Sequence, residues 1–264
     1  MTLPRLTRRL AHTMTTSVPP ADIPTLSQLY HHDLTNPVNV KHKYAFRQQL
    51  NDRISIWRGD ITKLEANMIV NAANSSLLGG GGVDGAIHSA AGKQLLEECK
   101  SLGGAHTGET KFTDGYNLPS KKIAHTVGPV YRSYSPQRAA QLLKSCYTTS
   151  LEGCRDLGGG VIGFSSISTG VYGYPIKDAT HIALETTRQF LEQDDTVRRA
   201  SLSLFPQLKT ANDFLNFSGG TKKKKTYRLQ ESSTSCFQKG MKMSIGRLFR
   251  SISLLIPSMG NESG

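Results

Sequence analysis

The residues best suited to chemistry lie in one polar, glycine-rich stretch, residues 71–85. An apolar run leads into Asn71 and Asn74, four consecutive glycines follow at 79–82, and Asp84 comes two residues after the last of them. Glycine lets a backbone approach a ligand closely, and a helix that follows offers free N–H groups and the positive end of its dipole to an anion. Amide and carboxylate groups beside that anion could orient a substrate or accept a proton. The stretch predicts a phosphate-binding loop that carries its own reactive groups.

A second loop, residues 165–175, repeats this logic. A buried strand ends in serines and a threonine, Gly170 and Gly173 follow, and Pro175 opens a helix at a position where its missing N–H costs nothing. Ligands of open α/β sheets bind at the carboxyl ends of the strands, where two such loops can meet. Neither loop matches the GxGxxG dinucleotide pattern or the GxxxxGK[ST] pattern. Together they favour a pyrophosphate over a single phosphate.

The elements that must position these loops follow from the apolar periodicity. Strands are expected at 54–57, 68–71, 110–116, 122–127 and 161–164, and helices at 84–102, 137–157 and 176–193. Strands that alternate with helices of this length indicate an α/β domain with a largely parallel sheet. Such a domain needs one more strand after its last helix, and residues 200–205 offer only a weak edge strand.

The chain divides into four segments. Residues 1–22 are interpreted as a leader or linker, 23–51 as a strap with a short helix, 52–206 as the domain, and 207–264 as a basic, mostly disordered tail. The first 21 residues contain no acidic side chain and carry three arginines among serines and threonines. This composition fits a mitochondrial transit peptide and fits a disordered N-terminus equally well.

The net charge of +12 is concentrated at the two ends of the chain. Residues 1–50 hold 6 Lys and Arg against 2 Asp and Glu, residues 51–200 hold 16 against 15, and residues 201–264 hold 10 against 3. The run Lys222–Lys225 could be a nuclear-localisation or RNA-binding patch, or a solvated charge run. Nucleic acid is therefore a weaker alternative partner, which would be bound by the basic ends of the chain.

The cysteines indicate an intracellular chain, either mitochondrial or cytoplasmic and nuclear. The four cysteines form no CxxC pair and have no paired histidine spacing, so neither a zinc site nor a disulfide framework is expected. No apolar run approaches the roughly 20 residues that a membrane span needs, so no span is expected.

Six motifs in order resemble a macrodomain of the MacroD type, between about residues 52 and 195. They are GDIT at 59–62, VNAAN at 70–74, the glycine loop at 79–85, IHSAAG at 87–92, HTVGP at 125–129 and STGVYGYP at 168–175. The resemblance implies a three-layer α/β/α fold with a mixed, largely parallel six-stranded sheet. It implies ADP-ribose as the ligand, and a hydrolase that removes mono-ADP-ribose from acidic side chains of proteins and deacetylates O-acetyl-ADP-ribose. A non-catalytic ADP-ribose reader is the alternative.

The resemblance also implies the ligand contacts. Asp60 would accept the adenine amino group beside the Ile61 N–H, and Tyr174 would pack against the distal ribose. The diphosphate would be held by Gly80, Gly81, Gly82 and Val83 on one side and by Ser168, Thr169, Gly170, Val171 and Tyr172 on the other. Without the resemblance, an Asp at the position of Asp60 is more often a turn or capping residue, and Tyr174 could be a lid over the core.

Asn74 and Asp84 are the catalytic pair that the resemblance implies. Asn74 would hold the ribose hydroxyls, and Asp84 would orient a water or accept its proton, although the ligand's own phosphate could activate that water instead. The alternatives are a helix N-cap for Asp84 and a turn-closing side chain for Asn74. Asn71 is expected to be structural and His88 to be a packed helix residue. No metal or cofactor is expected, because backbone donors and helix dipoles suffice for a diphosphate.

The C-terminal part departs from the family pattern. Arg198 and Arg199 are followed by a weak strand and a lysine-rich tail, where family members close with an apolar strand and a helix. We hypothesise an alternative reading frame or a retained intron beyond about residue 198. A missing strand would leave a sheet edge or a core face exposed.

Overall fold

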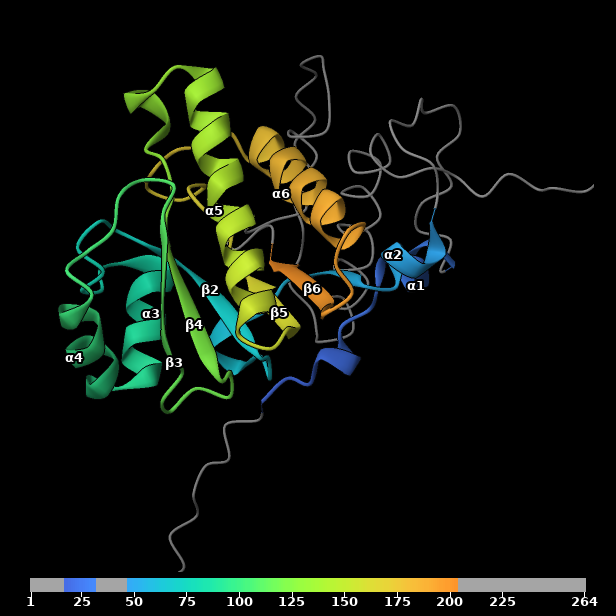
Figure 1. Ribbon diagram of the computed structural model, residues 1–264, viewed down its shortest axis with the longest axis horizontal. Coiled ribbons are helices and arrows are strands. Elements are labelled where there is room, and N and C mark those ends of the chain that lie inside the picture. Colours follow the sequence, from blue (N-terminus) through green and yellow to red (C-terminus); the bar gives the residue numbers. More distant parts are fainter. Residues whose placement is uncertain (1–16, 32–46, 204–264) are drawn as a thin grey trace, which may run out of the picture.

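The computed structural model of the protein describes residues 17–31 and 47–203 (Figure 1). The arginine-rich start of the predicted leader and the whole predicted tail, including Lys222–Lys225, lie outside the described residues. Among the helices of the described ranges, none is both long enough and apolar enough to cross a membrane.

Six strands form one sheet in the order β1-β6-β5-β2-β4-β3. Their bounds are Ile54–Trp57 for β1, Met68–Ala73 for β2, Thr110–Asp114 for β3, Lys122–Val127 for β4, Gly160–Phe164 for β5 and Val197–Ser203 for β6. All neighbouring strands are parallel except β3, which runs antiparallel to β4 at one edge. This confirms the mixed, largely parallel six-stranded sheet.

Helices cover both faces of the sheet and complete three layers (Figure 1). Helices α3 (Gly82–Ala91) and α4 (Lys93–Ser101) pack on one face, and α5 (Pro136–Asp156) and α6 (Ile176–Leu191) pack on the other. Side chains of a strand alternate between the faces. In β2, Ile69 accordingly joins the core under α3 and α4, and Val70 joins the core under α5 and α6.

The single helix expected at 84–102 is wrong, because Gly92 divides it into α3 and α4. Gly92 has a φ of 92°, and its N–H donates to the His88 carbonyl to end the first helix. A side chain is strained in this left-handed conformation, and a Cβ here would lie 2.8 Å from the Asn117 amide nitrogen.

The last strand also differs from the expectation. β6 is an inner strand with β1 and β5 on its two sides, so it is not an edge strand, and the edges are β1 and β3. Val197 and Leu202 are fully buried in it. The Arg53 guanidinium donates to the Leu191 carbonyl (2.9 Å) and the Val197 carbonyl (2.7 Å), which ties the start of β6 to α6. The sheet therefore has its closing strand, and the domain extends at least through Ser203.

The N-terminal segment packs on the domain from residue 17 onward. Val18 forms a bridge with Leu64, in which its N–H donates to the Lys63 carbonyl (2.7 Å) and its carbonyl accepts from the Glu65 N–H (3.0 Å). The predicted leader thus ends in folded structure. Within the predicted strap, short helices α1 (Leu26–His31) and α2 (Gln48–Asn51) each bury a leucine in the core under α5 and α6.

Candidate functional site

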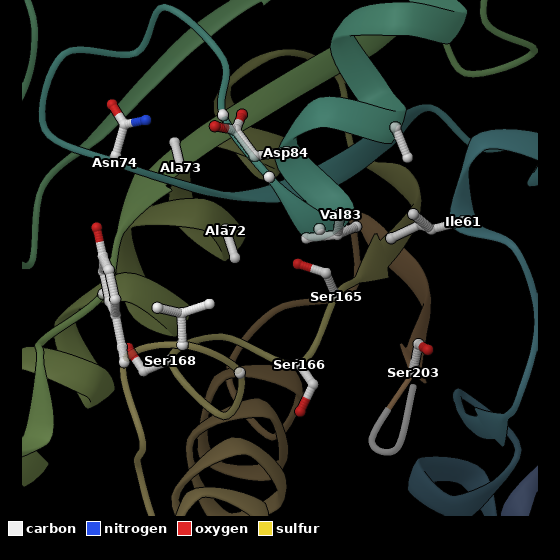
Figure 2. Close-up of a pocket in the computed structure, with 18 of the residues that line it drawn as sticks. Ile61, Ala72, Ala73, Asn74, Val83, Asp84, Ser165, Ser166, Ser168 and Ser203 are labelled. Atoms are coloured by element: carbon white, nitrogen blue, oxygen red, sulfur yellow. The ribbon is translucent and has the colours of Figure 1, made fainter. Parts of the chain in front are cut away.

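A pocket of about 680 Å³ opens at the carboxyl ends of the parallel strands (Figure 2). This size suits a small organic ligand. The loops after β1, β2 and β5, the start of α3, and Ser203 at the end of β6 line it. Every residue that the resemblance assigned to ligand or catalysis lines it except Thr169 and Tyr174.

The glycine loop forms one wall and feeds directly into α3. The helix begins at Gly82, so its first turn faces the pocket with unpaired N–H groups. A Cβ on Gly85 would lie 2.3 Å from the Gly80 carbonyl oxygen, so only glycine lets the loop fold back on the helix. In the described part of the chain no lysine or arginine lines the pocket, and its charged side chains are those of Asp60 and Asp84. An anion here would rely on backbone donors and the helix dipole.

The loop after β5 forms the opposite wall. Ser168 is buried and has a φ of 62°, an uncommon conformation for a residue with a side chain. A Cβ on Gly128 would lie 2.1 Å from the Ser168 Oγ, so Gly128 leaves room for that side chain. The Tyr131 N–H donates to the Tyr172 carbonyl (2.9 Å) and fixes the outer part of the loop, while Val171 is fully exposed at the rim.

Asp84 lies inside the first turn of α3 and is buried. Its Oδ1 accepts from the Asn71 Nδ2 (2.7 Å) and lies 3.6 Å from the His88 Nε2. Burial raises the pKa of this carboxyl group, and the Asn71 hydrogen bond and the nearby His88 oppose the rise. The helix N-cap is Gly81, with no side-chain cap, so the alternative of Asp84 as an N-cap is wrong.

Asn74 both closes its loop and faces Asp84. Its Nδ2 donates to the Gly79 carbonyl (2.8 Å), and its Oδ1 accepts from the backbone N–H (3.0 Å) and hydroxyl (2.6 Å) of Ser76. The turn-closing role is therefore real. One Nδ2 hydrogen remains for a ligand. A Cβ on Gly80 would lie 3.2 Å from both the Asn74 Nδ2 and the Asp84 Oδ2, so the two side chains flank one point (Figure 2).

Asp60 caps the short helix η2 (Ile61–Lys63). Its Oδ1 accepts from the Thr62 N–H (3.0 Å) and the Thr62 hydroxyl (2.7 Å), so the expected capping alternative is present. Asp60 is exposed and lines the pocket, as do its neighbour Ile61 and Ser203. Figure 2 shows Ile61 and Ser203 across the pocket from Asn74.

Two expected ligand residues are turned away from the pocket lining. Thr169 is buried, and its hydroxyl donates to Ser166. Tyr174 is 3% exposed and belongs to the core under α5 and α6, with its ring centroid 4.8 Å from that of Tyr131. Its position is that of the lid over the core, which was the alternative to a ribose contact.

Sequence reasoning missed some of the lining. Gly128 follows β4 and Ser203 ends β6, and neither had been assigned to the ligand. Both lie at carboxyl ends of parallel strands, so a correct strand order would have pointed to them.

Near Asp84 lies a cluster of the partly buried His88 with the buried Cys99 and His125, whose nearest ligand-type atoms are within 4.8 Å of one another. Both ring nitrogens of His125 already have partners, Asn71 on Nδ1 (3.1 Å) and Thr113 on Nε2 (2.9 Å). Burial raises the pKa of the Cys99 thiol to about 11, which opposes the thiolate that a metal would need. Hydrogen bonding, rather than metal binding, therefore explains this cluster.

Fold and pocket together define an α/β/α ligand-binding domain, and comparisons with known proteins identify its family. The family model "Macro domain" matches residues 70–183. A "Macro domain-containing protein" of Methanosarcina mazei is 52% identical over 158 residues, which cover 60% of this chain and 84% of that protein. The chain belongs to the macrodomain family.

Two further comparisons concern ADP-ribose. The rat protein "ADP-ribose glycohydrolase MACROD1" is 49% identical over 164 residues, 62% of this chain and 64% of that protein. The match therefore spans less than two thirds of that relative. The crystal structure of a Trypanosoma brucei macrodomain in complex with ADP-ribose is 38% identical, with a TM-score of 0.59 and 71% coverage of each chain.

Proposed function

We propose that the protein is a hydrolase that removes mono-ADP-ribose from acidic side chains of proteins and deacetylates O-acetyl-ADP-ribose. The observation that carries the proposal is the placement of Asn74 and Asp84 on two sides of Gly80, at one end of the pocket. The similarity to an ADP-ribose glycohydrolase and to a macrodomain crystallised with ADP-ribose supports the ligand class.

The ligand would lie across the pocket with its diphosphate between the two loops. Residues 80–83 would supply N–H donors from the start of α3, and residues 168–172 would close over the other side. The adenine would lie beside Asp60 and Ile61. This orientation places the distal ribose, which carries the scissile ester, between Asn74 and Asp84.

The chemistry would be general-base hydrolysis. Asp84 would accept a proton from the attacking water, and its raised pKa makes it a better base near neutral pH than an exposed aspartate. The free Nδ2 hydrogen of Asn74 would hold a ribose hydroxyl and orient the bond. A phosphate oxygen of the ligand is the competing base.

A glutamate-linked mono-ADP-ribosylated peptide tests this proposal directly. We expect wild-type turnover, at least a 100-fold loss in Asp84→Ala, a smaller loss in Asn74→Ala, and ADP-ribose binding by both variants in calorimetry. Wild-type binding without turnover would instead support the reader. Unchanged activity in both variants would overturn the catalytic assignment and favour the phosphate as base.

Salt separates pocket binding from nucleic-acid binding. Neutralising many phosphates makes affinity fall steeply with salt, whereas a pocket lined by no lysine or arginine in the described ranges should hold ADP-ribose with little salt dependence. A steep fall in ADP-ribose affinity between 50 and 200 mM salt would contradict the proposed binding mode.

We also infer a reducing, intracellular location. The three cysteines of the described residues are buried and unpaired. Imaging the full chain with a C-terminal tag, alongside a variant lacking residues 1–16, distinguishes mitochondrial from cytoplasmic or nuclear protein. Export of the full chain from the cell would contradict the inference.

A further inference from the structure

A row of buried polar side chains leads from Asp84 across the sheet, through Asn71 on β2 and His125 on β4, to Thr113 on β3. Strand alternation puts all three on the face under α3 and α4, where Asn71 is the register partner of His125. All are at most 2% exposed, and none of the three lines the pocket. Burying polar groups is costly unless each is hydrogen-bonded, so the directions of these bonds are informative.

The hydrogens in this row can be assigned one after another. The Asn71 Nδ2 donates to the Asp84 Oδ1 (2.7 Å), which sets the direction of the amide. The second Nδ2 hydrogen points to the His125 Nδ1 (3.1 Å), which therefore accepts. A neutral His125 then carries its proton on Nε2 and donates to the Thr113 hydroxyl oxygen (2.9 Å), whose own hydrogen can reach the Asp114 carbonyl (3.2 Å).

The Asn71 amide cannot reverse without loss. Its Oδ1 is buried and has no hydrogen-bond partner among the described residues. A reversed amide would place both N–H groups at that site without acceptors, and would turn the carbonyl oxygen toward the carboxylate of Asp84. The N–H end is therefore held toward Asp84 for as long as the His125 Nδ1 accepts.

We propose that His125 and Thr113 are positioning residues, which act through Asn71 to keep Asp84 ionised and aimed at the pocket. This inference rests on the proposed function to the extent that Asp84 serves as the base. Protonation of His125 would put a donor against the Asn71 N–H and break the arrangement. Burial, with the nearby His88, lowers the pKa of His125 to about 3, so the imidazole stays neutral across the working range.

Three other ionisable side chains face this row, and their charge could also affect the pH dependence of the reaction. His88 on α3 is 3.6 Å from Asp84, Cys99 on α4 is 3.8 Å from the His125 Nε2, and Tyr172 across the pocket feels the charge of Asp84. The pKa values of Cys99 and Tyr172 are both raised, so these groups stay neutral at pH 5–8. His88 is the ionisable side chain in contact with Asp84, so each comparison is repeated in a His88→Gln background.

Thr113→Val against Thr113→Ser is the matched test. Valine keeps the shape and removes the acceptor that fixes the His125 tautomer, whereas serine keeps it. We expect Thr113→Val to lower kcat about 5-fold, to leave the Kd for ADP-ribose within about 2-fold, and to move the acid limb of the kcat profile to higher pH. The limb moves up because loss of the Asn71 hydrogen bond raises the pKa of Asp84 further. Thr113→Ser should follow wild type.

Nitrogen-15 NMR of His125 in wild-type protein supplies a readout that needs neither a variant nor turnover. We expect the Nε2–H tautomer from pH 5 to 8, and a mixture of tautomers in Thr113→Val. The Nδ1–H tautomer in wild type, or an unmoved acid limb in Thr113→Val, would overturn the proposal. If wild type proves inactive, the proposed function fails, and the tautomer with the Asp84 carboxyl titration still decides this inference.

Discussion

The two faces of the sheet differ in the polarity of the side chains buried against them. Under α5 and α6 the core is large and apolar, and the rings of Tyr147 and Phe164 pack there at a tilt, with a centroid distance of 5.0 Å. Under α3 and α4 the apolar core also encloses Asn71, His125 and Asp84. A buried carboxylate and a buried imidazole lower stability unless they are paired, so their presence on one face is best explained by the adjacent pocket. The apolar face stabilises the fold, and the polar face equips the site.

The largest effect on stability is expected on the apolar face. Tyr147→Ala should lower the free energy of unfolding by about 3–5 kcal/mol, because it leaves a cavity where a fully buried ring packs on Phe164. Urea unfolding measures the loss, and Tyr147→Phe is the control that keeps the ring. Hydrolysis per folded molecule should not change. A loss below about 1 kcal/mol would show that the faces do not differ in this way.

The next effect is a dependence of stability on acid. His125 has a folded pKa of about 3 against an ordinary value near 6.5, so the unfolded chain binds a proton first as the pH falls. Its contribution to stability is complete above pH 6.5 and is lost as the pH falls toward 3. His125→Gln should therefore flatten the fall in unfolding free energy between pH 6.5 and 4, as followed by urea titrations. An equally steep fall in the variant would refute the assignment to His125.

Asp84→Asn should have a smaller effect of the opposite sign. Burial raises the folded pKa of Asp84 above its unfolded value of 3.8, so wild type loses stability as the pH rises from the unfolded to the folded pKa. The neutral amide does not suffer this loss. The variant should therefore be more stable than wild type at pH 7, and the difference should vanish once the pH falls below the unfolded pKa of 3.8. Lower stability of the variant at pH 7 would contradict this.

The smallest effect is expected at the pocket rim. Val171 is fully exposed, so Val171→Ala should change the unfolding free energy by less than about 0.5 kcal/mol. Thermal unfolding measures the change in stability, and ADP-ribose calorimetry shows whether the folded variant still binds. A large loss of stability would show that Val171 at the rim also contributes to the stability of the fold.

The pocket loops were predictable because each lies in one contiguous stretch of sequence. The glycines at 79–82 with Asp84, and the loop at 168–172, carry their spacing on the chain itself, and the structure brings both to one pocket. The sheet class was predictable for a similar reason, since alternation of strands and helices is a local pattern.

What depends on contacts between distant segments was not predictable. The bonds from His125 to Asn71 and Thr113 follow from strand register, which nothing near any of these residues in the sequence reveals. Residues 200–205 were expected to form only a weak edge strand, yet Ser201 is fully buried in β6 between two neighbouring strands. Tyr174 was likewise assigned to the ribose, although tertiary packing turns it into the core.

Single-turnover hydrolysis of a mono-ADP-ribosylated peptide by Asp84→Asn, read beside its ADP-ribose affinity and its unfolding free energy, tests the division between the two faces most directly. We predict turnover at least 100-fold below wild type, affinity within about 3-fold, and stability equal to or above wild type. Turnover within 10-fold of wild type in this folded, ligand-binding variant would contradict the claim that the buried polar face exists to supply the base.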